Sequence, residues 1–478
     1  MPTFSPAQLA RWTAGRWTAS PTTPLTGFTI DSRLLHAGQI FVALKTDKRD
    51  GHDFLAAAQA AQASAAIVST PNPALTLPQL VVADPLLAFQ TIAREHRRTF
   101  SGPVIGITGS AGKTSTKNML ALLLGREACG VLATEGNLNN HLGVPLTLTR
   151  LDPAKHKFAV IEAGISAPGD MGTLADMIEP DLALTTLVSA AHTQELGSVD
   201  GVAREKARLS AAVRPTGVAI FPTHCAGFSA FRMLDVRKMV IEAAEVIRPA
   251  EPAKDKIYFA LTQRGDSTAI ALAYGAPPPL TFTMRRVTDG MAQNAVLAIC
   301  AALWLGVSPE LVQERLAEWA PAPLRGEWRR EDGRLLYLDC YNANPASMAD
   351  ALDTFCAVSP AADPRLFILG GMEELGADSP QLHRALGRSV PMRAQDFLTV
   401  VAEHSAEVRA GAIEGGSTVT QIAVETSIAP VAARLAEFQG SVFVKGSRRY
   451  ALEKSLPPTS GETADAADPL RTPAPVHA

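Results

Sequence analysis

A glycine-rich turn near residue 110 contains residue types that bind phosphate. Residues 108–114 read TGSAGKT, between an apolar run, VIGIT, and a helix-forming run that starts at Lys117. Glycines let backbone N–H groups converge on phosphate oxygens, and a helix N-terminus adds positive potential. Lys113 is placed to neutralise phosphate charge, and the Thr114 hydroxyl is placed to ligate magnesium. We predict a nucleotide site formed by Gly109, Ser110, Ala111, Gly112, Lys113, Thr114 and Ser115.

The glycine spacing departs from the general phosphate-loop pattern of Gly, four residues and Gly-Lys-Ser/Thr. Counting back from Gly112, the first glycine would stand at 107, where the chain has Ile107. The motif alone leaves two interpretations, a nucleotide site of another kind or a plain glycine-rich turn. Gly-Lys-Thr after a strand and before a helix favours the nucleotide site.

Three residues further along the chain could serve a metal ion beside the phosphates. Glu162 ends an apolar run, FAVIE, His192 follows another apolar run, and Lys206 lies in the helical stretch VAREKARL. A magnesium nucleotide needs carboxylate near its phosphates. Each residue also has a plainer explanation: Glu162 as a helix cap, His192 as a structural or surface side chain, and Lys206 as a solvated helix lysine.

Apolar runs alternate with helical stretches in two parts of the chain, which predicts an α/β fold with parallel sheets flanked by helices. The first alternating segment begins at Val104 and ends with the helix at 295–306, before the Pro-rich stretch 321–323. The second begins at Arg334 and contains four apolar runs, LLYLD, RLFILGG, FLTVV and VFVKGS. We expect three domains, a small α/β domain at 1–85, a central phosphate-loop domain at 86–320 and a Rossmann-like domain at 321–456. A disordered tail is expected at 457–478, because the segment is rich in Pro, Ala, Thr and Asp.

Composition excludes several classes of protein. A formal net charge of −3 over 478 residues gives no electrostatic basis for binding nucleic acid or an anionic membrane. The five cysteines are scattered without CxxC spacing, which is typical of reduced thiols in a cytoplasmic protein. The longest apolar run, 295–307, is too short to span a bilayer and predicts a buried helix. The first residues lack the pattern of a secretory signal.

Several blocks in order along the chain resemble the Mur ligases of peptidoglycan synthesis. The loop TGSAGKT fits that family's short form, Thr-Gly-x-x-Gly-Lys-Thr. GNLNNHLGVP at 136–145, DCYNANP at 339–345 and LGGMEELG at 369–376 are similar to three further family blocks. Near the start, DSR at 31–33, GQIFVAL at 38–44 and DGH at 50–52 resemble the family's UDP-binding module. The blocks are most similar to those of members that add D-alanyl-D-alanine to UDP-N-acetylmuramoyl-tripeptide.

The resemblance implies a chemistry and a set of site residues. ATP would phosphorylate the tripeptide carboxylate, and the amine of D-alanyl-D-alanine would attack the acyl phosphate. Two approaching anions need cations between them, here Lys113 and Mg²⁺. The resemblance assigns metal binding to Thr114, Glu162, His192 and a carbamylated Lys206, and catalysis to Lys113, Glu162, His192, Lys206 and Arg325.

The resemblance also assigns binding roles outside the loop. Asn294, opening the Ala-rich helix, would contact adenine, and Arg325 and Asp339 would close over the phosphates and ribose. The expected substrate contacts are Ser32, Arg33, Asn137, Asn139, Asn140, Tyr341, Asn342 and Asn344. The Asn cluster at 137–140 equally suits a capped turn. Lys445 and the residues after it could cap a helix or touch substrate. The expected partners are the two substrates alone, and the family implies a monomer.

The chain departs from the family pattern at several places. The usual Gly-x-His-Asn-x-x-Asn is replaced by TDGMAQN at 288–294, so only the last Asn remains. Gly371 stands where Asp is common, and FPTHC at 221–225 replaces Asn-x-Asp-Asp. The alternatives are a ligase for another amino acid, a catalytically weak or non-catalytic nucleotide-binding relative, and an ordinary phosphate-loop ATPase. We expect an active enzyme, because Lys113, Glu162, His192, Lys206, Arg325 and Asp339 are all present.

Overall fold

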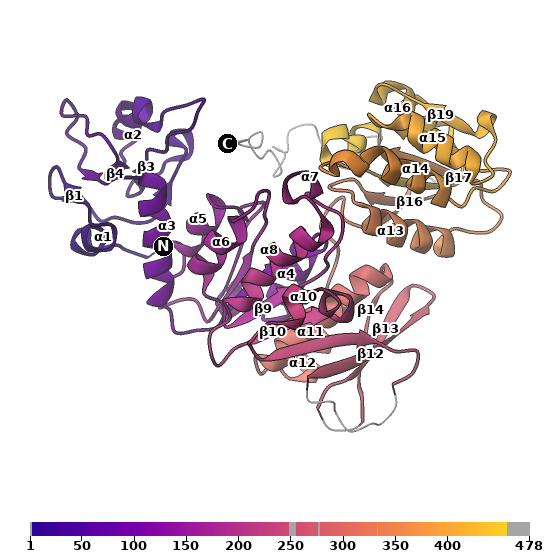
Figure 1. The fold of residues 1–478 in the computed structure, drawn as a ribbon, viewed down its shortest axis with the longest axis horizontal. Helices are drawn as coiled ribbons and strands as arrows, with labels where there is room; N and C mark the ends of the chain where they lie inside the picture. The colour runs from indigo at the N-terminus through magenta and orange to yellow at the C-terminus, as the bar shows by residue number, and fades with distance from the viewer. Residues whose placement is uncertain (1, 248–254, 276–277, 332, 457–478) are drawn as a thin grey trace.

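Three β-sheets, each with its own helices, organise the computed structural model, which describes residues 2–247, 255–275, 278–331 and 333–456. The predicted α/β class is confirmed. The N-terminal unit (indigo) and the C-terminal unit (yellow) lie at opposite ends of the molecule, and the central unit joins them (Figure 1). The predicted disordered tail at 457–478 lies outside the described residues.

The N-terminal sheet has five short strands in the order β1-β5-β4-β3-β2, parallel except for β1. Its strands are β1 (Arg16–Trp17), β2 (Phe28–Thr29), β3 (Ile40–Val42), β4 (Ala65–Val68) and β5 (Gln79–Val81). The buried residues 40–42 and 65–68 form β3 and β4. The helices are α1 (Pro6–Thr13), α2 (Leu55–Ala60) and α3 (Pro85–Arg98).

Helix α3 connects this unit to the central one. Asp84 caps its first turn by accepting hydrogen bonds from Leu86 N and Leu87 N. At its other end the buried Arg97 donates to Ile178 O at 2.9 Å and pairs with Asp181 at 2.9 Å. A buried guanidinium whose donors are satisfied on a neighbouring unit anchors the helix there.

The central sheet has nine strands in the order β14-β13-β12-β11-β10-β9-β6-β8-β7. The predicted parallel arrangement holds from β7 to β12, but β12, β13 and β14 run antiparallel. Only residues 265 and 266 connect β12 to β13, and so short a connection makes a hairpin. The strands are β6 (Val104–Thr108), β7 (Val131–Ala133), β8 (Phe158–Glu162), β9 (Leu182–Thr185), β10 (Val218–Pro222), β11 (Lys238–Ala243), β12 (Lys256–Arg264), β13 (Ser267–Ala273) and β14 (Leu280–Arg285).

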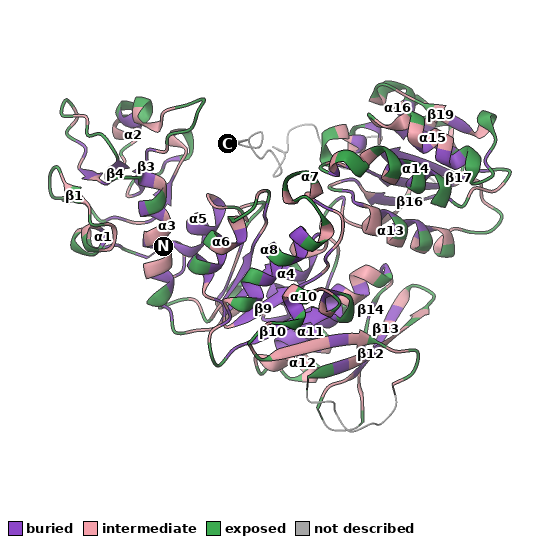
Figure 2. Ribbon diagram, viewed as in Figure 1, coloured by how far each residue is buried: buried purple, intermediate pink, exposed green. Residues whose placement is uncertain are grey.

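Helices flank this sheet, and its neighbouring strands β6 and β9 are buried along their whole length (Figure 2). The predicted buried helix at 295–306 corresponds to α11 (Asp289–Trp304), which begins six residues earlier and ends two residues earlier than expected, so Asn294 lies inside the helix. No helix of the described residues is long and apolar enough to cross a membrane. The other helices are α4 (Lys113–Leu123), α5 (Gly143–Leu148), α6 (Asp170–Ile178), α7 (Thr193–Leu196), α8 (Val199–Ala211), α9 (Thr223–Ala226), α10 (Ser229–Arg232) and α12 (Pro309–Ala317).

The third sheet has the order β15-β16-β20-β17-β18-β19 and is parallel except for β15. The four predicted apolar runs form β16 (Arg334–Asp339), β17 (Arg365–Gly370), β18 (Phe397–Val401) and β20 (Ser441–Lys445). The prediction missed the two edge strands, the charged β15 (Glu327–Glu331) and the three-residue β19 (Ile422–Val424). The helices are α13 (Pro345–Val358), α14 (Ser379–Ser389), α15 (Ser405–Glu414) and α16 (Ile428–Glu437).

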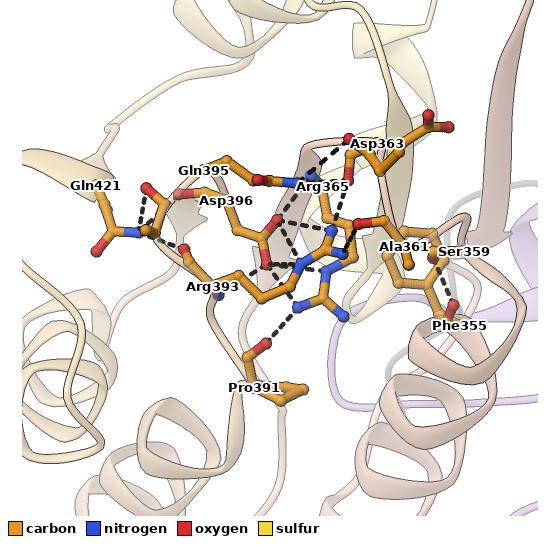
Figure 3. Close-up of polar contacts among 12 residues, drawn as sticks. Phe355, Ser359, Ala361, Asp363, Arg365, Pro391, Arg393, Gln395, Asp396 and Gln421 are labelled. Atoms are coloured by element: carbon orange, nitrogen blue, oxygen red, sulfur yellow. Dashed lines mark hydrogen bonds and ion pairs between the residues drawn. The ribbon is translucent and has the colours of Figure 1, made fainter.

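A buried ion pair stabilises this third unit (Figure 3). The side chains of Arg365 and Asp396, 6% and 0% exposed, are joined by an N–O contact of 2.5 Å. Arg393 adds a second contact to Asp396 at 3.0 Å. Burial acts to raise the pKa of Asp396, but the hydrogen bonds from Arg393 and Arg365 outweigh burial and hold that pKa below its usual value.

Asp396→Ala is expected to lower the free energy of unfolding of this unit by about 3–5 kcal/mol, because it leaves the Arg365 charge buried without its partner. The lowered pKa means that the pair contributes fully above the unfolded pKa, about 4. That contribution disappears as the pH falls through the lower folded pKa. Urea unfolding followed by circular dichroism at pH 7 and at lower pH measures the difference. The exposed Asp378→Ala is the control, and equal effects of the two changes would contradict this interpretation.

Candidate active site

The glycine-rich turn joins β6 to α4, as the sequence predicted. Gly112 has φ +79°, a left-handed conformation that favours glycine, and it precedes the first residue of α4, Lys113. A Cβ atom at Gly109 would collide with the Thr186 hydroxyl, so the turn also requires a residue without a side chain at position 109. Lys113 Nζ donates to Gly109 O at 2.8 Å, which holds the ammonium group at the loop. Its surroundings lower the pKa of Lys113 by desolvation, whereas the nearby Glu162 acts to raise it.

Glu162 lies beside this loop because β8 pairs with β6, with Glu162 opposite Ile107. Its Oε1 accepts hydrogen bonds from Thr114 Oγ1 at 3.1 Å and from Asn139 Nδ2 at 2.8 Å. Its Oε2 is buried and has no hydrogen-bond partner among the described residues. A buried carboxylate oxygen without a partner beside a phosphate-type loop fits a cation ligand.

Lys206 is fully buried on α8, and its Nζ also lacks a partner among the residues that the structure describes. Burial, reinforced by the charge of Lys113, holds the pKa of Lys206 well below its usual value. An unpartnered buried lysine is costly as an ammonium ion, so this environment favours the neutral amine. The plainer expectation of a solvated helix lysine is therefore wrong.

His192 has a left-handed backbone, with φ +57°, just before α7. Its Nδ1 contacts a carboxylate oxygen of Glu374 in the third unit, and Glu374 also has a positive φ, +62°. Thr193 Oγ1 donates to Leu375 O at 3.1 Å, so the 192–193 turn contacts the third unit. Within the described residues, no group of three or more His, Cys, Asp and Glu side chains is arranged around a metal position.

A cavity of about 400 Å³ lies between the central and third units. Loop residues 110–115 and Glu162 line it from the central unit, whereas Gly109, His192 and Lys206 are not among its lining residues. The other predicted site residues that line it are Asn137, Asn139, Asn294, Arg325, Asp339, Tyr341, Asn342 and Asn344. Residues more than 200 positions apart in the sequence thus meet in one cavity, where the third unit covers the glycine-rich loop.

Several contacts position these cavity side chains. The Arg325 guanidinium lies 3.7 Å from the centroid of the Tyr341 ring, a cation–π geometry. Asp339 forms an ion pair with the buried Lys445. The Asn294 amide abuts Gly112, where any Cβ atom would meet it. Asn294 therefore contacts the loop through space that only glycine leaves open.

The asparagine residues divide between two roles. Asn140 Oδ1 accepts from Leu142 N at 3.1 Å and Gly143 N at 2.8 Å, and Asn140 does not line the cavity. Asn140 thus forms the capped turn that the sequence also allowed. Asn344 caps α13 and donates from Nδ2 to Ser110 O at 3.4 Å, joining the third unit to the loop.

Ser32 and Arg33 lie in the N-terminal unit, outside this cavity. Arg33 pairs with Asp31 at 2.6 Å, and its side chain is 73% exposed. Their assignment to a substrate remains a prediction from the family resemblance.

The sequence did not single out several cavity residues. Trp319 and Trp328 line the cavity, and the Trp328 ring packs edge-on against Tyr337 with centroids 4.7 Å apart. Asp350 on α13 also lines it. Trp319, Trp328 and Asp350 carry no motif, and their position depends on how the units meet. The sequence allowed two roles for Lys445, a helix cap or a substrate contact. Lys445 lines the cavity and forms an ion pair with Asp339.

This combination defines a class of protein: a phosphate-type loop on a parallel sheet, a carboxylate beside it, and a Rossmann-like unit that completes the site. The chain belongs to the Mur ligase family. Residues 107–302 match the Mur ligase middle domain, and residues 324–448 match the Mur ligase, glutamate ligase domain.

Curated relatives and solved structures match nearly the whole chain. The Escherichia coli UDP-N-acetylmuramoyl-tripeptide--D-alanyl-D-alanine ligase is 32% identical, over 90% of this chain and 92% of the relative. The Bacillus subtilis ligase of the same name is 29% identical, over 82% and 83%. A crystal structure of MurF from Acinetobacter baumannii has a TM-score of 0.82 at 28% identity, covering 95% of this chain and 98% of that one.

Proposed function

We propose that this protein is an ATP-dependent amide ligase that joins D-alanyl-D-alanine to UDP-N-acetylmuramoyl-tripeptide, giving ADP and phosphate. The observation that carries the proposal is the single cavity in which the loop at 110–115, Glu162 and the third-unit residues Arg325 and Asp339 meet. Relatives that share most of this chain's length bear the name of this activity.

ATP is the proposed nucleotide, and its triphosphate is assigned to the loop. Lys113 would neutralise the phosphates, while Asn294, Arg325 and Asp339 would contact adenine, phosphate and ribose. The unpartnered Oε2 of Glu162 and the neighbouring Thr114 hydroxyl are suited to hold Mg²⁺. When bound, Mg²⁺ would screen the phosphate charge that opposes the approach of the substrate carboxylate.

A second Mg²⁺ position is assigned to Glu162, His192 and a carbamylated Lys206. Support for Lys206 comes from its burial and its unpartnered Nζ, since a neutral buried amine is the form that reacts with carbon dioxide. His192 Nδ1 contacts Glu374 in this structure, so His192 would have to leave Glu374 in order to hold the metal.

The proposed reaction has two bond-forming steps. An oxygen of the tripeptide carboxylate attacks the γ-phosphorus of ATP, which forms an acyl phosphate and releases ADP. The amine of D-alanyl-D-alanine then attacks the acyl carbon, loses a proton, and displaces phosphate. Asn137, Asn139, Tyr341, Asn342 and Asn344 would orient the peptidyl substrate, while Ser32 and Arg33 in the N-terminal unit hold the uridine diphosphate.

Three lesser assignments complete the proposal. The domains are taken as 1–85, 86–320 and 321–456, which divides the roles among UDP binding, ATP binding and closure. The protein is proposed to act as a monomer in the cytoplasm.

Phosphate release from ATP and Mg²⁺, with each substrate omitted in turn, tests the proposal. Full turnover is expected only with UDP-N-acetylmuramoyl-tripeptide and D-alanyl-D-alanine together, because phosphate leaves only after the amine attacks. Release without either acceptor would identify a simple ATPase, and no release under any condition a binding protein. Turnover with a different amino acid in place of the dipeptide would identify a ligase of another specificity.

A further inference from the structure

A carboxylate of the third unit lies at the start of a helix of the central unit. Asp350, on α13, accepts a hydrogen bond through Oδ1 from the backbone N–H of Gly290, at 3.0 Å. Gly290 is the second residue of α11, whose N-cap, Thr288, accepts from Met291 N at 3.1 Å. The first turn of α11 is thus capped twice, once by Thr288 of the central unit and once by Asp350 of the third unit. A carboxylate at a helix N-terminus is stabilised by the free N–H groups and by the helix dipole.

The absence of a side chain at Gly290 leaves the space that Asp350 occupies. A Cβ atom there would lie 2.5 Å from Asp350 Oδ2, too close for non-bonded atoms. This glycine lies in 288–294, the stretch where the chain departs from the Mur ligase pattern. Gly290 in the first turn of α11 therefore leaves room for the side chain of Asp350 on α13, a helix of the third unit.

Helix α11 links the contact between Asp350 and Gly290 to the glycine-rich loop. Gly290 and Asn294 are four residues apart on α11, so they share one face of the helix. Both line the cavity, and the Asn294 amide abuts Gly112. A displacement of the first turn of α11 would consequently shift the residue that contacts the loop.

Charged groups of both units surround Asp350. Burial raises the pKa of Asp350, and Asp289 acts in the same direction, whereas Thr288, the Gly290 N–H and Lys445 lower it. Lys445 is also the ion-pair partner of Asp339. Two acids and one lysine of the third unit therefore line the cavity next to the N-terminus of α11.

We propose that Asp350 is a positioning residue for the nucleotide, which ties α13 to the first turn of α11 and so holds the two walls of the cavity together. The inference rests on the proposed function, because it takes the occupant of the cavity to be a nucleoside triphosphate. Asp350 acts through Gly290 and α11 and takes no part in bond making.

Direct binding of a non-hydrolysable ATP analogue with Mg²⁺, measured by calorimetry, tests the role of Asp350. Asp350→Ala is expected to weaken binding about 10-fold, as for loss of a hydrogen bond to a charged group. The KM for ATP should rise by a similar factor while the KM for the UDP-tripeptide stays constant. Asp353→Ala, at an exposed position of the same helix, is the matched control and should bind like the parent protein.

A double-variant cycle with Gly290→Ala makes the test specific. Gly290→Ala alone should weaken binding, because the new methyl group displaces the Asp350 carboxylate. In the Asp350→Ala background the same change should cost less than about twofold, since nothing remains to be displaced. Asp350→Asn keeps an acceptor oxygen and should retain most of the affinity.

The outcomes separate this inference from the proposed function. Parent protein that binds no nucleotide would overturn the proposed function and, with it, the role of Asp350. Parent protein that binds the analogue while Asp350→Ala binds equally well would overturn only the inference. An effect of Gly290→Ala that is equally large in both backgrounds would overturn it too. Should Asp350→Ala fail to fold, Gly290→Ala decides, because it must weaken binding with Asp350 in place.

Discussion

Replacing Lys113 by alanine is expected to reduce phosphate release from ATP by a factor of about 10² to 10³, the usual cost of removing a preorganised electrostatic group. Lys113 is the first residue of α4, and its Nζ is held at the loop by Gly109 O. The reaction brings a triphosphate and a carboxylate together, so a cation at this position stabilises the transition state more than the separate substrates. The measurement is kcat/KM for ATP with both acceptor substrates saturating.

Two further variants make the Lys113 experiment decisive. Lys157→Ala, at an exposed position of the same unit, should retain full turnover. Lys113→Arg should recover little activity, because a planar guanidinium does not replace a compact ammonium in a tight loop. Unchanged turnover in Lys113→Ala would mean that the loop does not bind the phosphates.

The second large effect is expected at Lys206. Lys206→Ala should reduce turnover by about 10- to 100-fold, the range seen when a supporting group of a metal site is lost. The amine is buried and unpartnered, and burial together with the charge of Lys113 lowers its pKa. Carbamylation forms an N–C bond with carbon dioxide, releases a proton and converts the amine into an anion that the Lys113 charge would attract.

The carbamate has a signature that a structural lysine lacks. Protein equilibrated with ¹³C-bicarbonate should show a carbamate carbon resonance that is absent from Lys206→Ala. A short carboxylic acid such as acetate should restore part of the activity of that variant, because it supplies an anion in the vacated space. Full activity of Lys206→Ala without any additive would refute the carbamate.

At two glycines where the chain departs from the family pattern, a neighbouring side chain occupies the space that a larger residue would need. A Cβ atom at Gly371 would lie 2.5 Å from Tyr450 Oη, so Tyr450 fills the space in which a larger residue would project. Gly290 is matched by Asp350 in the same way. Neither pairing carries a sequence signal, because the partners are 79 and 60 residues apart.

The strands that the sequence failed to predict share a physical reason. The edge strand β15 reads EWRRE and has no apolar face to detect, while β19 has only three residues. The prediction of a parallel sheet failed at β12–β14, where a hairpin replaces a helical crossover. Edge strands and hairpins take part of their stability from pairing with neighbours, which local composition does not record.

The sequence by itself determined the α/β class, the glycine-rich loop between β6 and α4, and the position of Glu162 at the end of β8. These features depend on short-range physics: apolar periodicity, glycine conformation and the strand-to-helix turn. Only the tertiary structure decided which side chains meet there, including Asp350 with Gly290, Lys445 with Asp339, and Glu374 with His192. The members of each pair are far apart in the chain. Asp350 with Gly290 and Glu374 with His192 meet because the third unit packs against the central unit, whereas Lys445 and Asp339 lie side by side on the paired strands β20 and β16 of the third sheet.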